Sequence, residues 1–171
     1  MATTRRLWVP VLVGLLVAVL FGPAGVTAVE PRTMTASIMI PAAAFVPDSN
    51  TIAHWNGGTY LTVSDQGYFV APVIFPVREV SVRRITTYAV FNGLGSVRVV
   101  LFRSSIAAFT VTGMGTVLNM NTDGSQAVYT TEISPRKVNT ALQAAVLGLE
   151  VNGPGASFRG VKITYTYETT P

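Results

Sequence analysis

Residues 161–168 read Val-Lys-Ile-Thr-Tyr-Thr-Tyr-Glu, and this stretch decides the class of fold. Apolar or aromatic side chains alternate with polar ones at a period of two, which is the period of a β-strand with one face in a core and the other in water. β-Branched and aromatic residues also suit a pleated, half-buried surface better than a helix. We therefore predict a β-strand over residues 161–168.

The chain before this strand has the same composition and is divided by turn residues, so we predict further strands along it. They are Thr35–Ile40, Tyr60–Ser64, Tyr68–Val73, Val77–Val82, Arg84–Phe91, Val97–Phe102, Gly115–Leu118, Ala127–Ile133 and Ala144–Val151. Asn92-Gly93-Leu94-Gly95 separates two of these alternating segments, which predicts a hairpin between them. Gly113-Met114-Gly115 lacks the lysine and the following helix of a phosphate-binding loop, so we interpret it as a bulge or bend in a strand.

About eight to ten short strands, spaced roughly 8–12 residues apart, are typical of a sandwich or jelly roll. The predicted fold is therefore all-β: a single-domain antiparallel β-sandwich, jelly-roll-like. One alternative stays open locally. A short helix within Pro135–Ala145 would fit the alanine and leucine spacing of residues 140–145.

The first 28 residues have the pattern of a cleaved export signal. Arg5 and Arg6 precede an uncharged apolar run, Leu7–Phe21, and Val26-Thr27-Ala28 offers small residues for cleavage. The run has about 15 residues, fewer than the roughly 20 of a membrane-spanning helix. We predict a signal peptide over residues 1–28, one β-sandwich domain over residues 29–171, secretion, and no transmembrane segment after cleavage.

Composition removes several classes of function. Charged residues make up only 12% of the chain and hydrophobic residues 49%, which excludes a long disordered or coiled-coil protein. Without cysteine there is no disulfide scaffold, thiol nucleophile or cysteine-bound zinc. The single histidine also disfavours metal sites and acid/base sites that depend on histidine. Removing Arg5 and Arg6 with the signal lowers the formal net charge from +4 to +2, so no nucleic-acid partner is predicted.

One loop, Asp48–Gly58, combines residue types that bind sugars. It places the single histidine beside the tryptophan that remains after cleavage, close to amide and carboxylate groups. A flat aromatic ring stacks on the C–H face of a sugar while polar groups bind its hydroxyls. The candidate ligand-binding residues are Asp48, His54, Trp55, Asn56 and Tyr60. The alternative is structural, with Trp55 capping the core and His54 bonding to a loop carbonyl.

The sequence predicts no catalytic and no metal-ligating residue. Sequence spacing does not show that any two of its carboxylates lie close enough for hydrolysis, and turn formation explains Asp65 and Asp123, which lie close to glycines. No serine has a nucleophile-elbow setting, and no second histidine can act as a base. We predict a non-enzyme without cofactors, with a structural calcium ion as a weaker alternative.

Three segments carry a resemblance to a known group. They are Ile40–Pro47, Phe69–Val80 and Phe158–Tyr165, which together resemble a family of secreted bacterial β-sandwich proteins of unknown function. The resemblance implies the fold and brings no catalytic residue with it. Members often carry Gly-Ala after the mid-chain proline, whereas this chain has Val77-Arg78-Glu79, which favours a chain that continues extended there.

These observations lead to one main hypothesis and two alternatives. The main hypothesis is a secreted, non-catalytic β-sandwich that acts by surface binding, to a glycan or cell-surface component, or as an extracytoplasmic structural component that forms oligomers. The first alternative is a carbohydrate- or cell-wall-binding, lectin-like module that uses Trp55 and Tyr60. The second is a glycan-acting hydrolase, which requires two carboxylates in one cleft.

Overall fold

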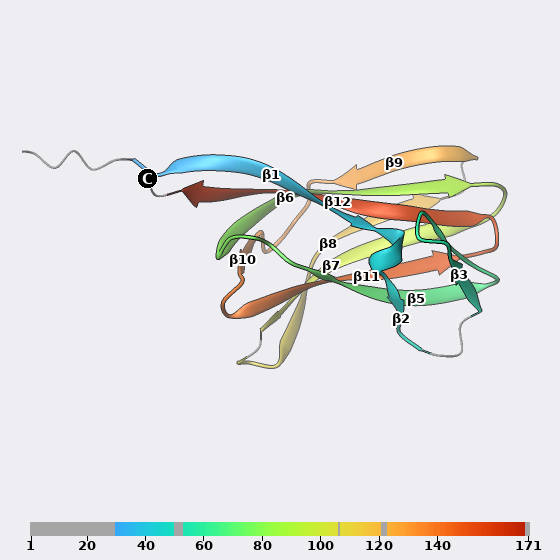
Figure 1. The fold of residues 1–171 in the computed structure, drawn as a ribbon, viewed down its shortest axis with the longest axis horizontal. Helices are drawn as coiled ribbons and strands as arrows, with labels where there is room; N and C mark the ends of the chain where they lie inside the picture. Colours follow the sequence, from blue (N-terminus) through green and yellow to red (C-terminus); the bar gives the residue numbers. More distant parts are fainter. Residues whose placement is uncertain (1–29, 50–52, 106, 121–122, 170–171) are drawn as a thin grey trace, which may run out of the picture. The chain divides into compact units, whose positions relative to one another are not determined.

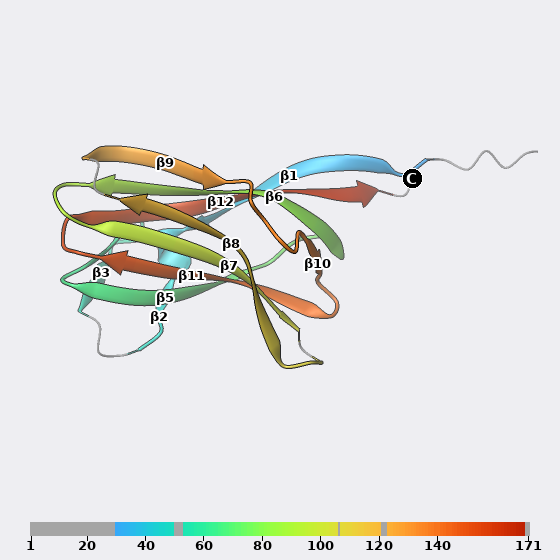
Figure 2. The same ribbon diagram turned by 180° about the vertical axis from the view of Figure 1, so that it is seen from behind.

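The computed structural model describes residues 30–49, 53–105, 107–120 and 123–169 and shows two antiparallel β-sheets packed face to face (Figures 1 and 2). Arg32–Thr169 is one compact unit that contains every described strand and the whole described core. The predicted signal peptide and its cleavage site lie outside the described residues.

The first sheet, sheet A, is built around its two longest strands, β6 and β12, which pair with each other. β1 and β4 pair with successive parts of β12, β9 and β10 pair with successive parts of β6, and β3 pairs with β4 at the edge. Its strands are β1 (Arg32–Pro41), β3 (His54–Asn56), β4 (Leu61–Val63), β6 (Glu79–Phe91), β9 (Gly124–Thr130), β10 (Lys137–Asn139) and β12 (Ala156–Thr169).

The second sheet, sheet B, has five strands in the order β2-β5-β11-β7-β8. They are β2 (Val46–Pro47), β5 (Gln66–Val73), β11 (Gln143–Asn152), β7 (Ser96–Ser105) and β8 (Thr110–Met120). A short 3-10 helix, η1 (Ala42–Ala44), carries the chain from β1 in sheet A to β2 in sheet B. Among the described residues, no helix is long and apolar enough to cross a membrane.

The core lies between the two sheets and comes from the inward side chains of each strand. Leu101 on β7, Leu147 on β11 and Ile163 on β12 are fully buried. Burial of such a side chain contributes about 1.5–3 kcal/mol to folding, and without disulfides the hydrophobic core is the main source of stability. The strand predicted at 161–168 is confirmed within β12, and the predicted all-β antiparallel sandwich is confirmed as a whole.

Two strand predictions are wrong in a way that a β-bulge explains. Val77–Val82 and Arg84–Phe91 were expected to be separate, yet both belong mainly to β6. The pairing of β6 with β12 skips one residue, because Thr164 pairs with Arg84 and Tyr165 with Val82. The extra residue breaks the alternation of inward and outward side chains, so one strand reads as two.

Three further expectations are corrected and one is confirmed. The hairpin through Asn92–Gly95 is wrong, because β6 lies in sheet A and β7 in sheet B, so this turn carries the chain between the sheets. Residues 135–145 form no helix, since β10, a turn and the start of β11 occupy them. The chain also bends at residues 76–78 instead of continuing extended. The bulge at Gly113–Gly115 is confirmed by a shift in the pairing of β7 with β8.

Candidate functional site

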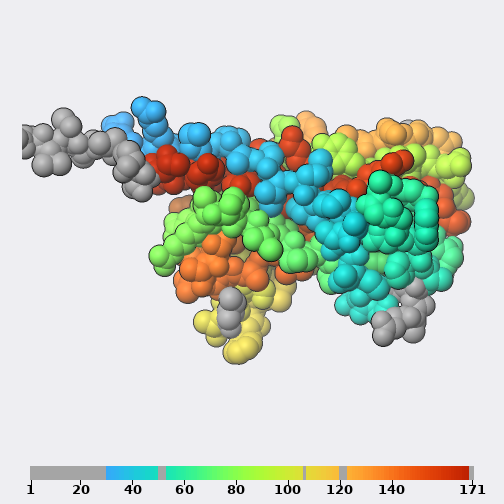
Figure 3. All heavy atoms as spheres, in the orientation of Figure 1, coloured from blue at the N-terminus to red at the C-terminus, as the bar shows by residue number. Residues whose placement is uncertain are grey.

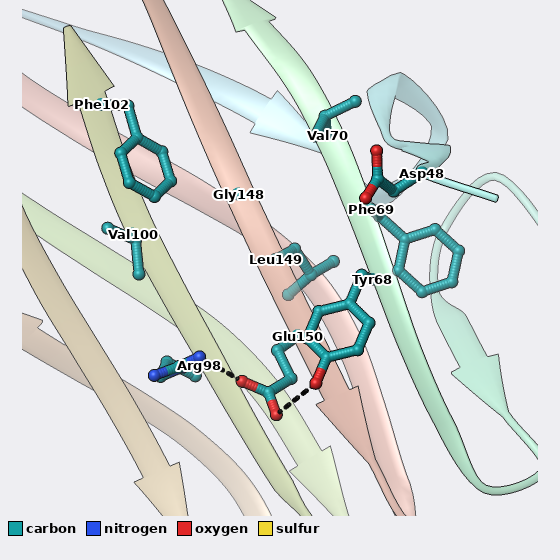
Figure 4. A pocket seen from close by; sticks show the side chains of 10 residues that line it. All are labelled: Asp48, Tyr68, Phe69, Val70, Arg98, Val100, Phe102, Gly148, Leu149 and Glu150. Atoms are coloured by element: carbon teal, nitrogen blue, oxygen red, sulfur yellow. Dashed lines mark hydrogen bonds and ion pairs between the residues drawn. The ribbon is translucent and has the colours of Figure 1, made fainter. Parts of the chain in front are cut away.

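The outer face of sheet B contains a shallow hollow of about 180 Å³ across its three central strands (Figure 4). Burial alternates along β5, β7 and β11, so every second side chain of these strands points outward. The residues that line the hollow are Asp48, Tyr68, Phe69, Val70, Arg98, Val100, Phe102, Gly148, Leu149 and Glu150.

Gly148 forms the floor of this hollow. It pairs with Val70 of β5 on one side and Val100 of β7 on the other, so the floor is apolar across three strands. A Cβ atom at Gly148 would lie only 2.9 Å from Cε2 of Phe102, because the Phe102 ring leans over the glycine. The absence of a side chain at this position therefore gives the hollow its depth and brings an aromatic ring to one of its walls.

The opposite wall is polar and is held by a network of hydrogen bonds. Tyr68, Glu150 and Arg98 are directly paired across β5, β11 and β7. A guanidinium nitrogen of Arg98 lies 2.7 Å from one Glu150 carboxylate oxygen, and the Gln66 amide donates to the other at 2.7 Å. The Gln66 amide nitrogen also lies 2.6 Å from the Tyr68 hydroxyl. This hydroxyl in turn donates to Glu150 at 3.5 Å (Figure 4). These contacts orient the Tyr68 ring at the rim.

Asp48 is the one predicted ligand-binding residue that reaches this hollow. It follows the two-residue strand β2, and its backbone N–H donates to the carbonyl of Tyr68 at 2.9 Å. This bond continues the ladder between β2 and β5 by one residue. Asp48 therefore stands at the same rim as Tyr68, at the edge of sheet B.

Trp55 and Tyr60 lie together elsewhere, on the outer side of sheet A. Their ring centroids are 4.7 Å apart in an edge-to-face arrangement, and Trp55 is 56% exposed. Trp55 pairs with Thr62 of β4, which pairs with Ser157 of β12. The Arg159 guanidinium stands 5.6 Å from the centroid of the Tyr60 ring. Trp55 is thus a surface residue and does not cap the core.

His54 and Asn56 flank Trp55 on the same short strand and point the other way. The His54 ring packs edge-on against Phe69 with their centroids 5.3 Å apart. The Asn56 amide donates to the carbonyl of Ala42 at 3.1 Å and lies 3.5 Å from that of Phe45. The five predicted residues therefore do not form one site. Asp48 lies at the hollow on sheet B, and Trp55 and Tyr60 lie on the outer side of sheet A. His54 and Asn56 pack between β3 and its neighbours.

The sequence analysis missed Tyr68, Phe102, Gly148, Arg98 and Glu150. All of them except Phe102 lie between apolar or glycine residues that are buried, so this alternation could have placed them on outward faces. The sequence does not show the strand order β5-β11-β7, which brings together three segments far apart in the chain. The mistaken hairpin with residues 84–91 also assigned Arg98 to a wrong neighbour.

Comparison with known proteins gives similar folds and no family. No family model matches the chain, and no curated protein matches it either. The predicted membership in a family of secreted bacterial proteins therefore stays a prediction.

Solved structures with a similar fold include three carbohydrate-binding modules. The first is the C-terminal family 6 module of LamC, a marine laminarinase from Zobellia galactanivorans, with 20% identity, a TM-score of 0.49, and coverage of 75% of this chain and 99% of that one. A family 36 module of a xylanase from the hindgut metagenome of Trinervitermes trinervoides has 12% identity, a TM-score of 0.47 and coverage of 75% and 96%. A family 15 xylan-binding module has 12% identity, a TM-score of 0.45 and coverage of 77% and 97%. At identities and scores this low, the likeness identifies no ligand.

Proposed function

We propose that the protein is a non-catalytic carbohydrate-binding module that acts outside the cytoplasm, with the hollow on sheet B as its glycan site. The observation that carries the proposal is that the hollow combines an apolar floor with two aromatic side chains. Tyr68 and Phe102 lie on the two strands that flank Gly148. A pyranose ring has an apolar C–H face and a rim of hydroxyls. It needs a floor of this kind with polar groups beside it.

The polar groups at the rim support binding of an uncharged sugar. Glu150 is neutralised by Arg98, so these two residues add hydrogen-bond donors and acceptors without net charge, and Asp48 leaves the lining with one formal negative charge. Arginine has five N–H donors, and the guanidinium is half exposed, with a side-chain exposure of 51%. A hydroxyl at the rim can therefore accept from Arg98 or donate to Glu150 without removing either from its partner.

Action outside the cytoplasm and the absence of catalysis rest on other features. The export pattern of residues 1–28 supports secretion. Glu150 is held by contacts with Arg98 and Gln66, which supports a role in binding for this carboxylate. Among the described residues, no three His, Asp or Glu side chains gather as metal ligands, so we propose binding without a metal ion.

Affinity electrophoresis of the chain from Val29 to Pro171 tests the proposal. The gels contain xylan, laminarin, galactomannan or starch, with and without EDTA. We expect at least one of these polymers to retard the protein, EDTA to change nothing, and Tyr68→Ala to weaken the retardation about tenfold or more, because aromatic stacking on the sugar is lost.

A matched control separates the hollow from general surface effects. Tyr129 is an exposed tyrosine of sheet A, 58% exposed against 46% for Tyr68, so Tyr129→Ala should retain binding. Gly148→Leu should fill the hollow and abolish binding while circular dichroism remains that of a β-sandwich. The proposal is overturned if no neutral polymer retards the folded protein, or if binding survives Tyr68→Ala and Gly148→Leu.

A glycan hydrolase is the second candidate, because Asp48 and Glu150 both line the hollow. Paired carboxylates on the two sides of a glycosidic bond are what hydrolysis requires. Release of reducing ends from the polymer that binds, lost in both Asp48→Asn and Glu150→Gln, would favour this candidate. Binding without release would favour the module.

A further inference from the structure

A second aromatic surface lies on sheet A, and hydrogen bonds hold the segment that carries it. It is built on β3, β4 and the turn between them, whose atoms (teal in Figure 3) lie beside those of η1. The Asn56 amide nitrogen donates to the Ala42 carbonyl at 3.1 Å, while its oxygen accepts from the Gly58 N–H at 3.1 Å. The turn closes with a bond of 3.1 Å from the Gly57 N–H to the Tyr60 carbonyl. Trp55 is therefore carried by a rigid support.

The Trp55 ring packs against the backbone at Gly57 and remains largely exposed to solvent. A Cβ atom at Gly57 would lie 3.0–3.3 Å from three carbon atoms of the indole, so the glycine backs part of the ring. The Tyr60 and Trp55 rings meet edge to face, with a centroid distance of 4.7 Å and an interplanar angle of 69°. With 56% of the residue exposed, the indole offers a flat apolar surface to solvent.

The charge beside this surface is positive. The Arg159 guanidinium stacks at 5.6 Å from the centroid of the Tyr60 ring and, within the part of the chain that the structure describes, has no carboxylate partner. The segments 53–63 and 156–163, which form the surface and the strand beside it, contain Arg159 and Lys162 and neither Asp nor Glu. The sheet B hollow differs, because its arginine is neutralised by Glu150.

We propose that Trp55, Tyr60 and Arg159 form a second binding site, which takes a carboxylate-bearing sugar such as the uronate unit of an acidic polysaccharide. The indole stacks on the C–H face of the sugar, and the planar guanidinium donates paired hydrogen bonds to its carboxylate. Stacking on Tyr60 already orders the guanidinium, which reduces the entropy lost when it binds. This site lies on the opposite sheet from the hollow and does not depend on it.

Trp55 supplies a direct signal for ligand at this site. Apart from Trp8 in the predicted signal peptide, it is the single tryptophan of the chain, so the emission of Val29–Pro171 reports on this surface alone. We would titrate this chain with polygalacturonate and, as a matched uncharged probe, with fully methyl-esterified polygalacturonate. The expected result is a saturable shift in emission with the acid and a much weaker response to the ester.

Two arginine variants separate a site from general charge attraction. Arg159→Gln should weaken binding of polygalacturonate by about tenfold or more, because hydrogen bonds to a charged group are lost. Arg78→Gln makes the same change of charge in the exposed connection between β5 and β6 and should leave affinity within about twofold. The start of β6 pairs with Thr166 of β12, whereas β4 pairs with Ser157 and Phe158 at the other end of β12. Circular dichroism verifies that both variants are folded.

The outcomes also separate this proposal from the first one. Tyr68→Ala should leave the Trp55 response intact, whether or not the sheet B hollow binds a neutral glycan. The proposal is overturned if the acid leaves Trp55 emission unchanged, if the ester binds equally well, or if Arg159→Gln and Arg78→Gln lose affinity equally. Loss of the response in Tyr68→Ala would also overturn it, because it would assign the acidic polymer to the hollow.

Discussion

Tyr165 is a buried residue whose hydroxyl should make stability depend on pH. It is 2% exposed, and its ring centroid lies 5.0 Å from that of Phe75 in an edge-to-face contact. Burial raises the pKa of this phenol above the ordinary value of 10.0, and the nearby Tyr167 raises it further. The folded protein therefore keeps its proton at a pH at which the unfolded chain loses it.

The sign of this effect is a loss of stability in alkali. Above about pH 10 the unfolded chain binds fewer protons than the folded one, so the free energy of unfolding falls as pH rises until the folded-state pKa is passed. Urea denaturation at pH 8 and pH 11 should show this fall, and Tyr165→Phe should reduce it. Tyr129→Phe, at an exposed position, is the control; an equal fall in wild type and Tyr165→Phe would contradict the prediction.

Candidate site residues were predictable from the sequence only where they are neighbours along the chain. Trp55 and Tyr60 are five positions apart and meet through a tight turn, so a local pattern of aromatic and small residues identified them together. The hollow instead depends on Gly148, whose importance comes from Phe102 on another strand. A glycine in an alternating segment does not indicate which ring will cover it.

At the scale of elements, side-chain alternation predicted most strands and failed where the backbone carries a bulge. β12 was expected over residues 161–168 because its alternation is regular there. In β6 the pairing with β12 skips Arg83, so Arg83 and Arg84 are both exposed. Two consecutive polar residues interrupt the alternation and look in the sequence like the end of a strand. The sheet to which each strand belongs was predicted less well than the strands themselves, because strands of both sheets have the same half-buried pattern.

The turn between β11 and β12 should be the connection most sensitive to substitution. Gly153 has a φ of +85°, and a Cβ atom there would lie 2.8 Å from the carbonyl oxygen of Leu94, in the connection from β6 to β7. The Cα atom of Gly95 would lie 3.1 Å away, and both atoms belong to the backbone, so neither moves easily. Gly153→Ala should lower the free energy of unfolding by about 2 kcal/mol or more, from left-handed strain together with displacement of the second loop.

Gly93 gives a matched comparison in that second loop. Its φ is +100°, yet no atom lies within 4 Å of the position of a Cβ. Gly93→Ala should therefore cost only the conformational strain, about 1 kcal/mol. Urea denaturation of both variants measures the difference, and equal losses would mean that the contact between the two loops does not stabilise the fold.

At the scale of the whole molecule, the sandwich presents its two candidate sites on opposite faces. Tyr68 and Gly148 lie on the outer face of sheet B, and Trp55 on the outer side of sheet A. The buried core lies between the sheets and separates the two surfaces. If both proposals hold, a monomer is able to link a neutral glycan to an acidic one.

This linking can be measured with two polymers and one protein. Polygalacturonate fixed to a surface is loaded with Val29–Pro171, and the neutral polysaccharide that retards this chain in gels is then passed over it. We expect capture of the neutral polymer in proportion to the protein loaded. Tyr68→Ala should load normally and capture nothing, because only the sheet B site is damaged, whereas Arg159→Gln should fail at loading. Displacement of the protein by the neutral polymer would contradict two separate sites, because competition requires a shared one.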